Sequence, residues 1–150
     1  MGLRDFTVYD MICRNALLYP ERDAVVFGDT RLDYRDYKQA CDRCAAGLVK
    51  AGIRKGDRFA VVANNSDRFL ILYGAAAKIG AIMVPVNWRF QQEEIRIVLE
   101  DCTPKIVFAG AEYQEPTAAA AAKVSAVKEL RSMSASTSSV CAMCRGVTFA

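Results

Sequence analysis

The sequence predicts an α/β protein built on an incomplete, open and mostly parallel sheet with flanking helices. One stretch of the sequence carries this prediction. Residues 58–90 hold an apolar run, a polar break, a longer apolar segment without alternation and a second short run rich in β-forming residues, which is the pattern of a strand, a crossover helix and a parallel strand. Because a parallel pair of strands is normally covered on both faces, helices from the rest of the chain are expected to pack on either side.

The central unit has clear boundaries. We expect a strand over residues 59–63, a helix capped by Ser66 or Asp67 and closed by Gly80, and a second strand over residues 82–86. Serine and aspartate accept hydrogen bonds from the first turn of a helix, and glycine adopts the left-handed conformation that ends one.

The residues before this unit predict a helix and a hairpin. Thr7 and Asp10 form a capping box for a helix through Leu18, and Gly28 with Asp29 joins two short strands in a tight turn. We expect this hairpin to be an edge element. The buried face of the helix is expected to comprise Val8, Met11, Ile12, Ala16 and Leu17.

A second long helix is expected between the hairpin and the central strand. Asp33 is its N-cap, Asp36 occupies the third helical position, and the helix ends at residues 51–52. After the second parallel strand, residues 91–101 predict another helix and residues 105–109 a third strand. The apolar stripe of the long helix recurs at spacings of three and four residues and comprises Tyr34, Tyr37, Ala40, Cys41, Cys44, Ala45 and Leu48.

The composition changes after Pro116. Residues 117–123 are mostly alanine, residues 126–131 are compatible with a helix, and a polar low-complexity stretch follows. We therefore divide the chain into a folded region, 1–116, and an Ala/Ser-rich tail, 117–150, that is poorly ordered.

Composition and charge exclude several classes of protein. The net charge is +3, and the basic residues are scattered rather than gathered into the stripe typical of nucleic-acid grooves. Residues 69–86 approach the length of a membrane span, but Lys78, Gly80 and Pro85 interrupt them. The first residues lack the apolar core of a secretory signal. These observations indicate a soluble, intracellular and cytoplasmic protein with no membrane span and no nucleic-acid partner.

Four blocks of sequence resemble a known family. They are LDYRDY (32–37), KGDRFAVVANNS (55–66), AAKIGAIMVPVNWRF (76–90) and EEIRIVLEDCTPKIVFA (93–109). In this order and spacing they resemble the N-terminal part of adenylate-forming acid–CoA ligases, the acyl-CoA synthetase family, over roughly residues 7–113.

The resemblance implies a function for the intact family rather than for this chain. Such ligases activate a carboxylic acid, here expected to be a fatty acid, with ATP and Mg²⁺ to an acyl-AMP and transfer the acyl group to CoA. The family's Ser/Thr/Gly-rich phosphate loop and its C-terminal domain have no counterpart here, and neither GxGxxG nor GxxxxGK(S/T) occurs. The resemblance therefore implies a truncated acyl-CoA synthetase-like protein that is inactive alone, and it implies ATP, Mg²⁺ and CoA as cofactors of the intact family.

The cysteines are the first alternative source of chemistry. Cys41 and Cys44 form one CxxC pair, and Cys141 and Cys144 form another, a pattern seen in zinc and redox sites. The long gap between the pairs and the position of Cys41 within a helix favour buried structural thiols instead. We predict no metal site.

Carboxylates and histidines offer no catalytic group either. The chain has no histidine, which removes the Ser-His and Cys-His arrangements. Glu93 with Glu94, and Asp33 with Asp36, lie in the first turns of helices, where negative charge offsets the helix dipole. We predict no catalytic residue.

Arg89 and Asn87 are the candidate binding residues. They follow the carboxyl end of a parallel strand, where ligands bind in open α/β sheets, and the resemblance adds that this arginine can lie near CoA phosphates. The alternative is structural: Arg89 would pair with Glu93 one turn later, and Asn87 would merely turn the chain.

Two functions remain open from the sequence. The first is the ligase fragment, with a small carboxylic acid and CoA as partners of the intact family. The second is a non-catalytic binding or regulatory module that pairs with another protein through its unfinished sheet edge, because an exposed strand edge is a template for pairing.

Overall fold

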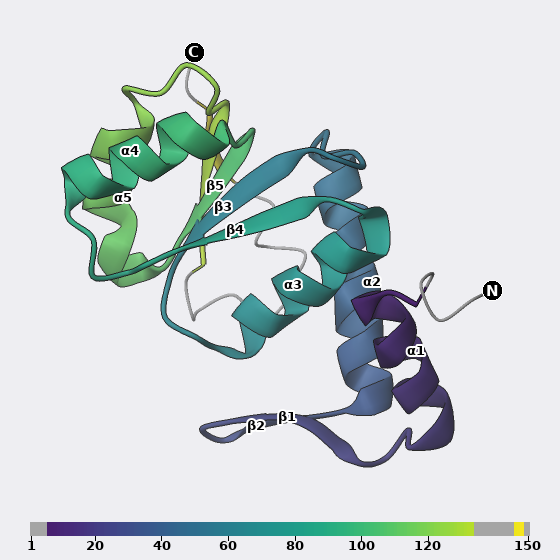
Figure 1. Ribbon diagram of the computed structural model, residues 1–150. Helices are drawn as coiled ribbons and strands as arrows, with labels where there is room; N and C mark the ends of the chain where they lie inside the picture. Colours follow the sequence, from purple (N-terminus) through teal and green to yellow (C-terminus); the bar gives the residue numbers. More distant parts are fainter. Residues whose placement is uncertain (1–5, 134–145, 149–150) are drawn as a thin grey trace.

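A computed structural model describes residues 6–133 and 146–148 of the chain (Figure 1). Within these residues helices and strands alternate after an N-terminal helix and hairpin. The elements are α1 (Val8–Leu18), β1 (Asp23–Phe27), β2 (Thr30–Asp33), α2 (Tyr34–Lys50), β3 (Arg58–Val62), α3 (Asp67–Ile79), β4 (Ile82–Val86), α4 (Gln92–Cys102), β5 (Ile106–Ala109), the 3₁₀ turn η2 (Ala111–Tyr113), α5 (Gln114–Ala121), β6 (Glu129–Ser132) and β7 (Gly146–Thr148).

The main sheet confirms the predicted fold class. Its strand order is β4-β3-β5-β6-β7, and the first four strands are parallel. Strand β7 pairs antiparallel with β6. The predicted strand, crossover helix and parallel strand are β3, α3 and β4, and the predicted third strand is β5. Strand β3 lies inside the sheet, where it pairs with β4 on one side and with β5 on the other.

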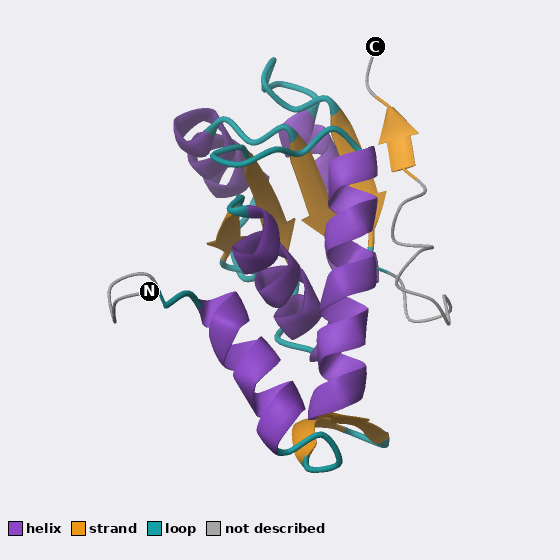
Figure 2. Cartoon of the chain, turned by 90° about the vertical axis from the view of Figure 1, so that its right-hand side faces the viewer, coloured by secondary structure: helices purple, strands orange, loops and turns teal. Residues whose placement is uncertain are grey.

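Helices cover both faces of this sheet (Figure 1, Figure 2). Alternate residues of β3 point to opposite faces, so Phe59 and Val61 pack against α2 and α3, whereas Ala60 and Val62 pack against α4 and α5. All four side chains are fully buried. Burial on both faces explains why β3 appears in the sequence as a continuous apolar run rather than an alternating one.

The helix starts follow the capping residues that the sequence predicted. The Thr7 side chain accepts a hydrogen bond from the Asp10 backbone N–H, and the Asp10 carboxylate accepts one from that of Thr7. Asp33 Oδ1 accepts from the Asp36 N–H at 2.7 Å. Ser66, rather than Asp67, caps α3. These side chains satisfy backbone donors that would otherwise lack partners.

Helix α3 ends as predicted at Gly80, whose φ of 69° is left-handed. The helix has 13 residues, too few to cross a bilayer. Among the residues that the structure describes, none of the helices combines the length and the apolar character that a membrane span requires.

The predicted buried face of α1 is wrong in large part. Ile12 is buried, but Val8, Met11 and Leu17 are exposed, and Ala16 is half-buried. Helix α1 lies at the margin of the molecule (Figure 1) and packs against α2 and α3 through one narrow side. Apolar periodicity identifies the helix, but it does not show how much of the apolar stripe a neighbour covers.

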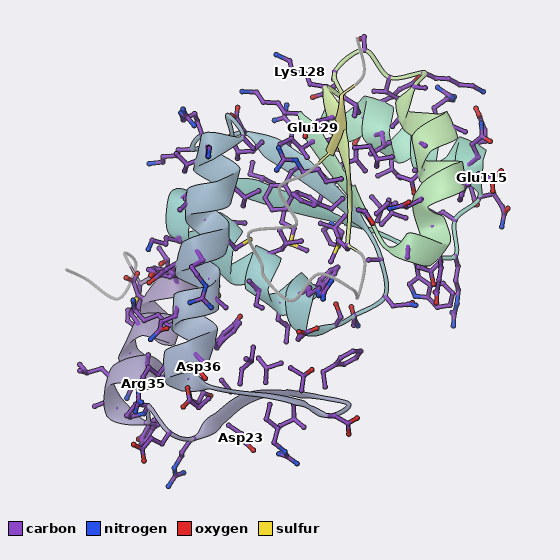
Figure 3. The ribbon with its side chains drawn as sticks, turned by 180° about the vertical axis from the view of Figure 1, so that it is seen from behind. Asp23, Arg35, Asp36, Glu115, Lys128 and Glu129 are labelled. Atoms are coloured by element: carbon purple, nitrogen blue, oxygen red, sulfur yellow. The ribbon has the colours of Figure 1, made fainter. Side chains whose placement is uncertain are left out.

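The predicted hairpin is present, but it is not an edge of the main sheet. Strands β1 and β2 form a separate two-stranded antiparallel sheet, with Gly28 in the turn at a φ of 56°. Figure 3 shows the hairpin, which carries Asp23, at the opposite end of the molecule from Glu129 of β6. The exposed pair of Arg31 and Asp23, at 2.8 Å, links its two strands.

The fold continues past the predicted boundary at Pro116. This proline lies within the first turn of α5, where its missing N–H costs little. The helix that the composition of residues 126–131 allowed does not form, because residues 129–132 form β6 beside β5. Leu130 is buried there against α4 and α5, so pairing and burial outweigh local composition. Residues 134–145 and 149–150 of the predicted tail lie outside the described residues.

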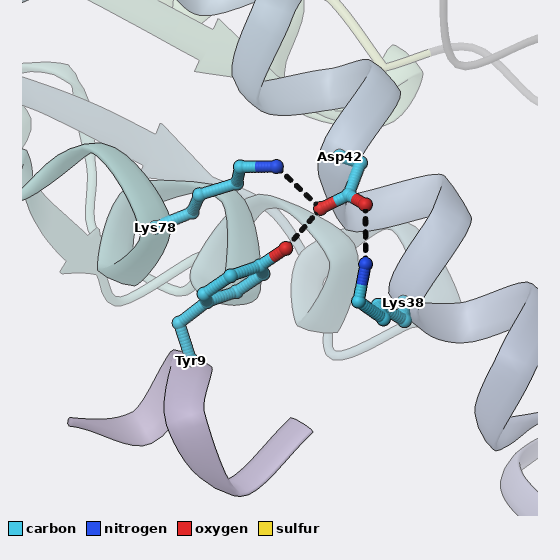
Figure 4. A network of polar contacts seen from close by, with 4 residues as sticks. All are labelled: Tyr9, Lys38, Asp42 and Lys78. Atoms are coloured by element: carbon cyan, nitrogen blue, oxygen red, sulfur yellow. Dashed lines mark hydrogen bonds and ion pairs between the residues drawn. The ribbon is translucent and has the colours of Figure 1, made fainter. Parts of the chain in front are cut away.

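Asp42 ties three helices together (Figure 4). Its carboxylate accepts hydrogen bonds from Lys38 Nζ at 2.8 Å, from Lys78 Nζ at 2.7 Å and from the Tyr9 hydroxyl. These partners come from α2, α3 and α1. Partial burial alone would raise the pKa of the Asp42 carboxyl, but the three hydrogen bonds outweigh it and lower the pKa from 3.8 to about 2.

We expect Asp42→Asn to destabilise the fold by about 1.5 kcal/mol at neutral pH, because charge-assisted hydrogen bonds are lost. The folded-state pKa is lowered, so the charged carboxylate stabilises the fold above its unfolded pKa, and this contribution disappears as the pH falls from 3.8 towards about 2. Urea unfolding followed across this range measures it, with Asp29→Asn in the exposed hairpin turn as control. A difference between Asp42→Asn and the parent chain that is independent of pH would contradict the assignment.

Candidate binding site at the carboxyl edge of the sheet

The strand order creates a crevice at one edge of the sheet. Strands β3 and β5 are neighbours, but the helix that follows β3 lies on one face and the helix that precedes β5 lies on the other. At such a reversal the loops beyond the carboxyl ends of the two strands diverge and leave room for a ligand. The candidate site is therefore the set of loops after β3, β4 and β5, called here the carboxyl-edge site.

A cavity lies at the reversal. Its volume is about 200 Å³, which is below the roughly 300–1,000 Å³ typical of pockets that enclose a small molecule. It can hold part of a larger ligand. The lining residues follow β3, β5 and β6, and they are Ala63, Asn64, Ser66, Gly110, Ala111, Glu112, Tyr113 and Met133.

Tyr113 joins the loops on either side of this cavity. Asn64 Nδ2, from the loop after β3, lies 2.8 Å from the Tyr113 hydroxyl, from the turn after β5. The Tyr113 ring packs over Gly110, where an added Cβ would lie 3.2 Å from Tyr113 Cδ2 and 3.6 Å from the Ala63 Cβ. Because Gly110 has no side chain, the Tyr113 ring can lie close to the end of β3.

The predicted residues Asn87 and Arg89 follow β4 at the same edge. Asn87 Oδ1 accepts a hydrogen bond from the Arg89 backbone N–H at 3.1 Å, so Asn87 turns the chain. The Arg89 guanidinium lies 4.7 Å from the centroid of the Trp88 ring, a cation–π distance. The Trp88 ring in turn lies 5.9 Å from the Tyr113 ring, tilted by 41°.

The structure does not contain the ion pair with Glu93 that the alternative role of Arg89 requires. Glu93 accepts a hydrogen bond from Arg96 at 2.6 Å and forms its ion pair there. Across residues 6–133, Arg89 has no carboxylate within ion-pair distance. Its contact with Trp88 places the guanidinium beside an aromatic wall rather than on α4. The role of Asn87 and Arg89 in ligand binding stays a prediction.

The carboxylates near the site have structural partners. Glu94 Oε2 accepts from the Gln91 backbone N–H at 2.8 Å and so caps α4. A hydrogen bond from Arg96 lowers the pKa of Glu93. Both carboxylates lie in the first turn of α4, as expected from the sequence.

The thiols of α2 are buried, as predicted. Cys41 and Cys44 have 0% and 6% of their surface exposed, and burial raises the pKa of the Cys41 thiol to about 12. Cys141 and Cys144 lie outside the described residues. Within residues 6–133 and 146–148, His, Cys, Asp and Glu side chains do not gather in the groups of three that could hold a metal ion.

Sequence reasoning missed Asn64, Gly110 and Tyr113. Asn64 follows the predicted strand over residues 59–63, and Gly110 ends the predicted strand over residues 105–109, so the rule that selected Arg89 also points to them. What the sequence does not contain is the strand order, which brings these two ends side by side. Together the site offers one guanidinium, two amides and two aromatic rings, which suit recognition of an anion and a planar group.

Comparison with known proteins matches the chain to one enzyme family. The model of the AMP-binding enzyme family matches residues 13–143. The long-chain-fatty-acid–CoA ligase FadD13 of Mycobacterium tuberculosis is 38% identical over 103 residues, covering 67% of this chain and 20% of the relative. The acyl-CoA ligase sidI of Aspergillus fumigatus is 33% identical over 106 residues, covering 69% and 18%. The chain thus spans about a fifth of the length of the curated relatives it matches.

Solved structures agree with the sequence comparison. The N-terminal domain of FACL13 from Mycobacterium tuberculosis superposes with a TM-score of 0.79 at 31% identity, covering 85% of this chain and 34% of that one. An anthranilate–CoA ligase at 18% identity superposes with a TM-score of 0.82, which shows the shared fold.

Proposed function

The chain belongs to the AMP-binding enzyme family, and on that premise we propose that it supplies the N-terminal sheet of an acid–CoA ligase and contacts CoA phosphates through Arg89. The whole ligase would join a carboxylic acid to CoA through an acyl-AMP, with ATP and Mg²⁺. The names of the relatives support a medium- or long-chain fatty acid as substrate.

The position of Arg89 is the observation that carries the proposal. It follows β4 at the carboxyl edge of the sheet, where ligands generally bind in open α/β folds, and it lies beside the loops after β3 and β5. A guanidinium presents several donors in a fixed plane and binds phosphate oxygens in pairs. Because the Trp88 ring supports it and no described carboxylate neutralises it, the charge is available for an anion.

The cavity accommodates part of CoA rather than all of it. At about 200 Å³ it matches one planar group or one phosphate with its surroundings. CoA supplies the thiol that accepts the acyl group. Arg89 lies outside the lining of this cavity, in the loop after β4, and its proposed part is to bind and orient the anionic end of CoA.

The 150 residues alone are expected to form no acyl-AMP. Their glycines are dispersed, so consecutive backbone N–H groups cannot gather around a triphosphate. Exchange of labelled pyrophosphate into ATP, measured with octanoic and palmitic acids, is expected to stay at the level of a blank without protein. Exchange above the blank would contradict this part of the proposal, because it would mean that the chain itself forms the acyl-AMP.

Arg89→Ala is expected to weaken CoA binding about tenfold, because a charge-assisted bond to phosphate contributes roughly 1.5 kcal/mol. Isothermal titration of the purified chain with CoA measures the change. The matched control is Arg22→Ala, since Arg22 also lies over an aromatic ring, Tyr19 at 5.4 Å, but in the loop after α1. Equal affinities of the parent chain and Arg89→Ala would contradict the role of Arg89.

One structural detail weighs against the alternative of pairing through the open edge at β4. The Ile82 N–H donates to the Asp57 carbonyl at 2.8 Å, so the peptide groups of Ile82 face β3. In a parallel strand these groups alternate between sides, and Pro85 therefore occupies an outward position without an N–H to donate. Proline at such a position is a common means of keeping an edge strand from recruiting a partner.

A further inference from the structure

We propose that Tyr113 is a positioning residue that holds Trp88 and Arg89 in place across the carboxyl edge of the sheet. The inference deepens the proposed function and rests on it where CoA is concerned. It concerns how the guanidinium is kept in one orientation before any ligand binds.

The contacts form a continuous chain across three strand ends. Tyr113 follows β5, yet its hydroxyl is bonded to Asn64 after β3 and its ring contacts Trp88 after β4. The strand order places β3 between the other two. Tyr113 therefore spans the end of β3 and connects both of its neighbours.

The position of the Tyr113 ring is determined from three directions. Its backbone N–H donates to the Gly110 carbonyl at 2.9 Å in the 3₁₀ turn, its ring packs closely over Gly110, and its hydroxyl is held by Asn64. A side chain fixed at its base, its face and its tip makes a rigid support. The ring also borders the core beneath α4 and α5.

Trp88, held by the Tyr113 ring, in turn keeps the Arg89 guanidinium in place. Trp88 is 38% exposed, so the position of its indole depends on the contacts that it keeps, and the Tyr113 ring at 5.9 Å is one of them. Arg89 lies over the same indole at 4.7 Å, while Asn87 fixes its backbone. An arginine that is already ordered loses less conformational freedom when it binds an anion.

The chain contains a built-in probe for this arrangement. Trp88 is its one tryptophan, so tryptophan fluorescence reports the site alone. Quenching by acrylamide measures how accessible the indole is, with no need for ligand or activity. The experiment compares the parent chain with Tyr113→Leu, Tyr113→Phe and Tyr73→Leu, the last being an exposed tyrosine of α3 that lies outside the site.

Tyr113→Leu is expected to raise the quenching constant about 1.5-fold and to weaken CoA binding about fivefold, because the ring that supports the indole is lost. Tyr113→Phe keeps the ring but loses the bond to Asn64, and it is expected to give values between those of the parent and of Tyr113→Leu, closer to the parent. Tyr73→Leu should change neither. Should Tyr113→Leu lose its helical circular dichroism signal, Tyr113→Met takes its place.

Two results overturn the inference: unchanged quenching in Tyr113→Leu, or a Tyr113→Phe variant as accessible as Tyr113→Leu. If the parent chain binds no CoA, the proposed function of Arg89 fails, whereas the quenching comparison still decides whether Tyr113 holds Trp88. The two failures are thus distinguishable.

Discussion

Gly74→Val is expected to destabilise the fold by about 3 kcal/mol through overpacking between α2 and α3. A Cβ at Gly74 would lie 2.5 Å from the Cys41 Sγ and 3.0 Å from the Ile12 Cδ1, and Cys41 has none of its surface exposed. Helix propensity alone predicts the opposite sign, because glycine is the weaker helix former. The free energy of unfolding in urea therefore separates packing from propensity.

The double variant Gly74→Val with Cys41→Ala provides the control. Removing the sulfur makes room for the new side chain, so the combined loss is expected to be smaller than the sum of the two single losses. Additive losses would show that the clash with Cys41 is not the cause.

Phe108→Ala is expected to cost about 4 kcal/mol, since a buried aromatic side chain is replaced by a cavity. Phe108 lies on β5, between β3 and β6, with 2% of its surface exposed. Its ring meets that of Phe59 edge to face, with centroids 5.6 Å apart and planes at 79°. A loss of this size approaches the lower end of the free energy of unfolding of a typical domain, which is roughly 5–15 kcal/mol.

The matched substitution is Phe27→Ala, on the hairpin. Phe27 is half exposed, and we expect its loss to cost less than about 1 kcal/mol. Thermal unfolding followed by circular dichroism compares the two. Similar shifts in Tm would mean that Phe108 is not the core residue described here.

Local signals predicted much of this fold from the sequence. Thr7, Asp33 and Ser66 each begin a helix because their side chains accept hydrogen bonds from the first turn. The continuous apolar run at β3 indicated a strand covered on both faces, and two cores confirm it. These signals act within a few residues, so one sequence is enough to detect them.

Signals that depend on distant partners were missed. Residues 126–131 suggested a helix because their composition permits one, but pairing with β5 makes residues 129–132 a strand. The apolar residues of α1 suggested a broad buried face, whereas its neighbours cover only Ile12 fully. Burial and pairing depend on which elements come together, and local composition does not carry that information.

The candidate site also combines residues that local signals select with contacts that depend on distant partners. Arg89 and Asn87 could be selected because they follow one strand, and the turn made by Asn87 was anticipated as an alternative. The link from Asn64 to Tyr113 to Trp88 joins residues from three loops, and it exists because β3 lies between β4 and β5.

The burial of Cys41 beneath α3 makes this thiol a reporter of opening. A thiolate is the reactive form, and burial raises the pKa of Cys41 to about 12, so a labelling reagent is expected to react only in molecules whose α2 and α3 have separated. The rate of modification at Cys41 then measures how often the two helices part under native conditions. Because Gly74 packs closely against Cys41, the modification rate of this thiol reports local unfolding between α2 and α3.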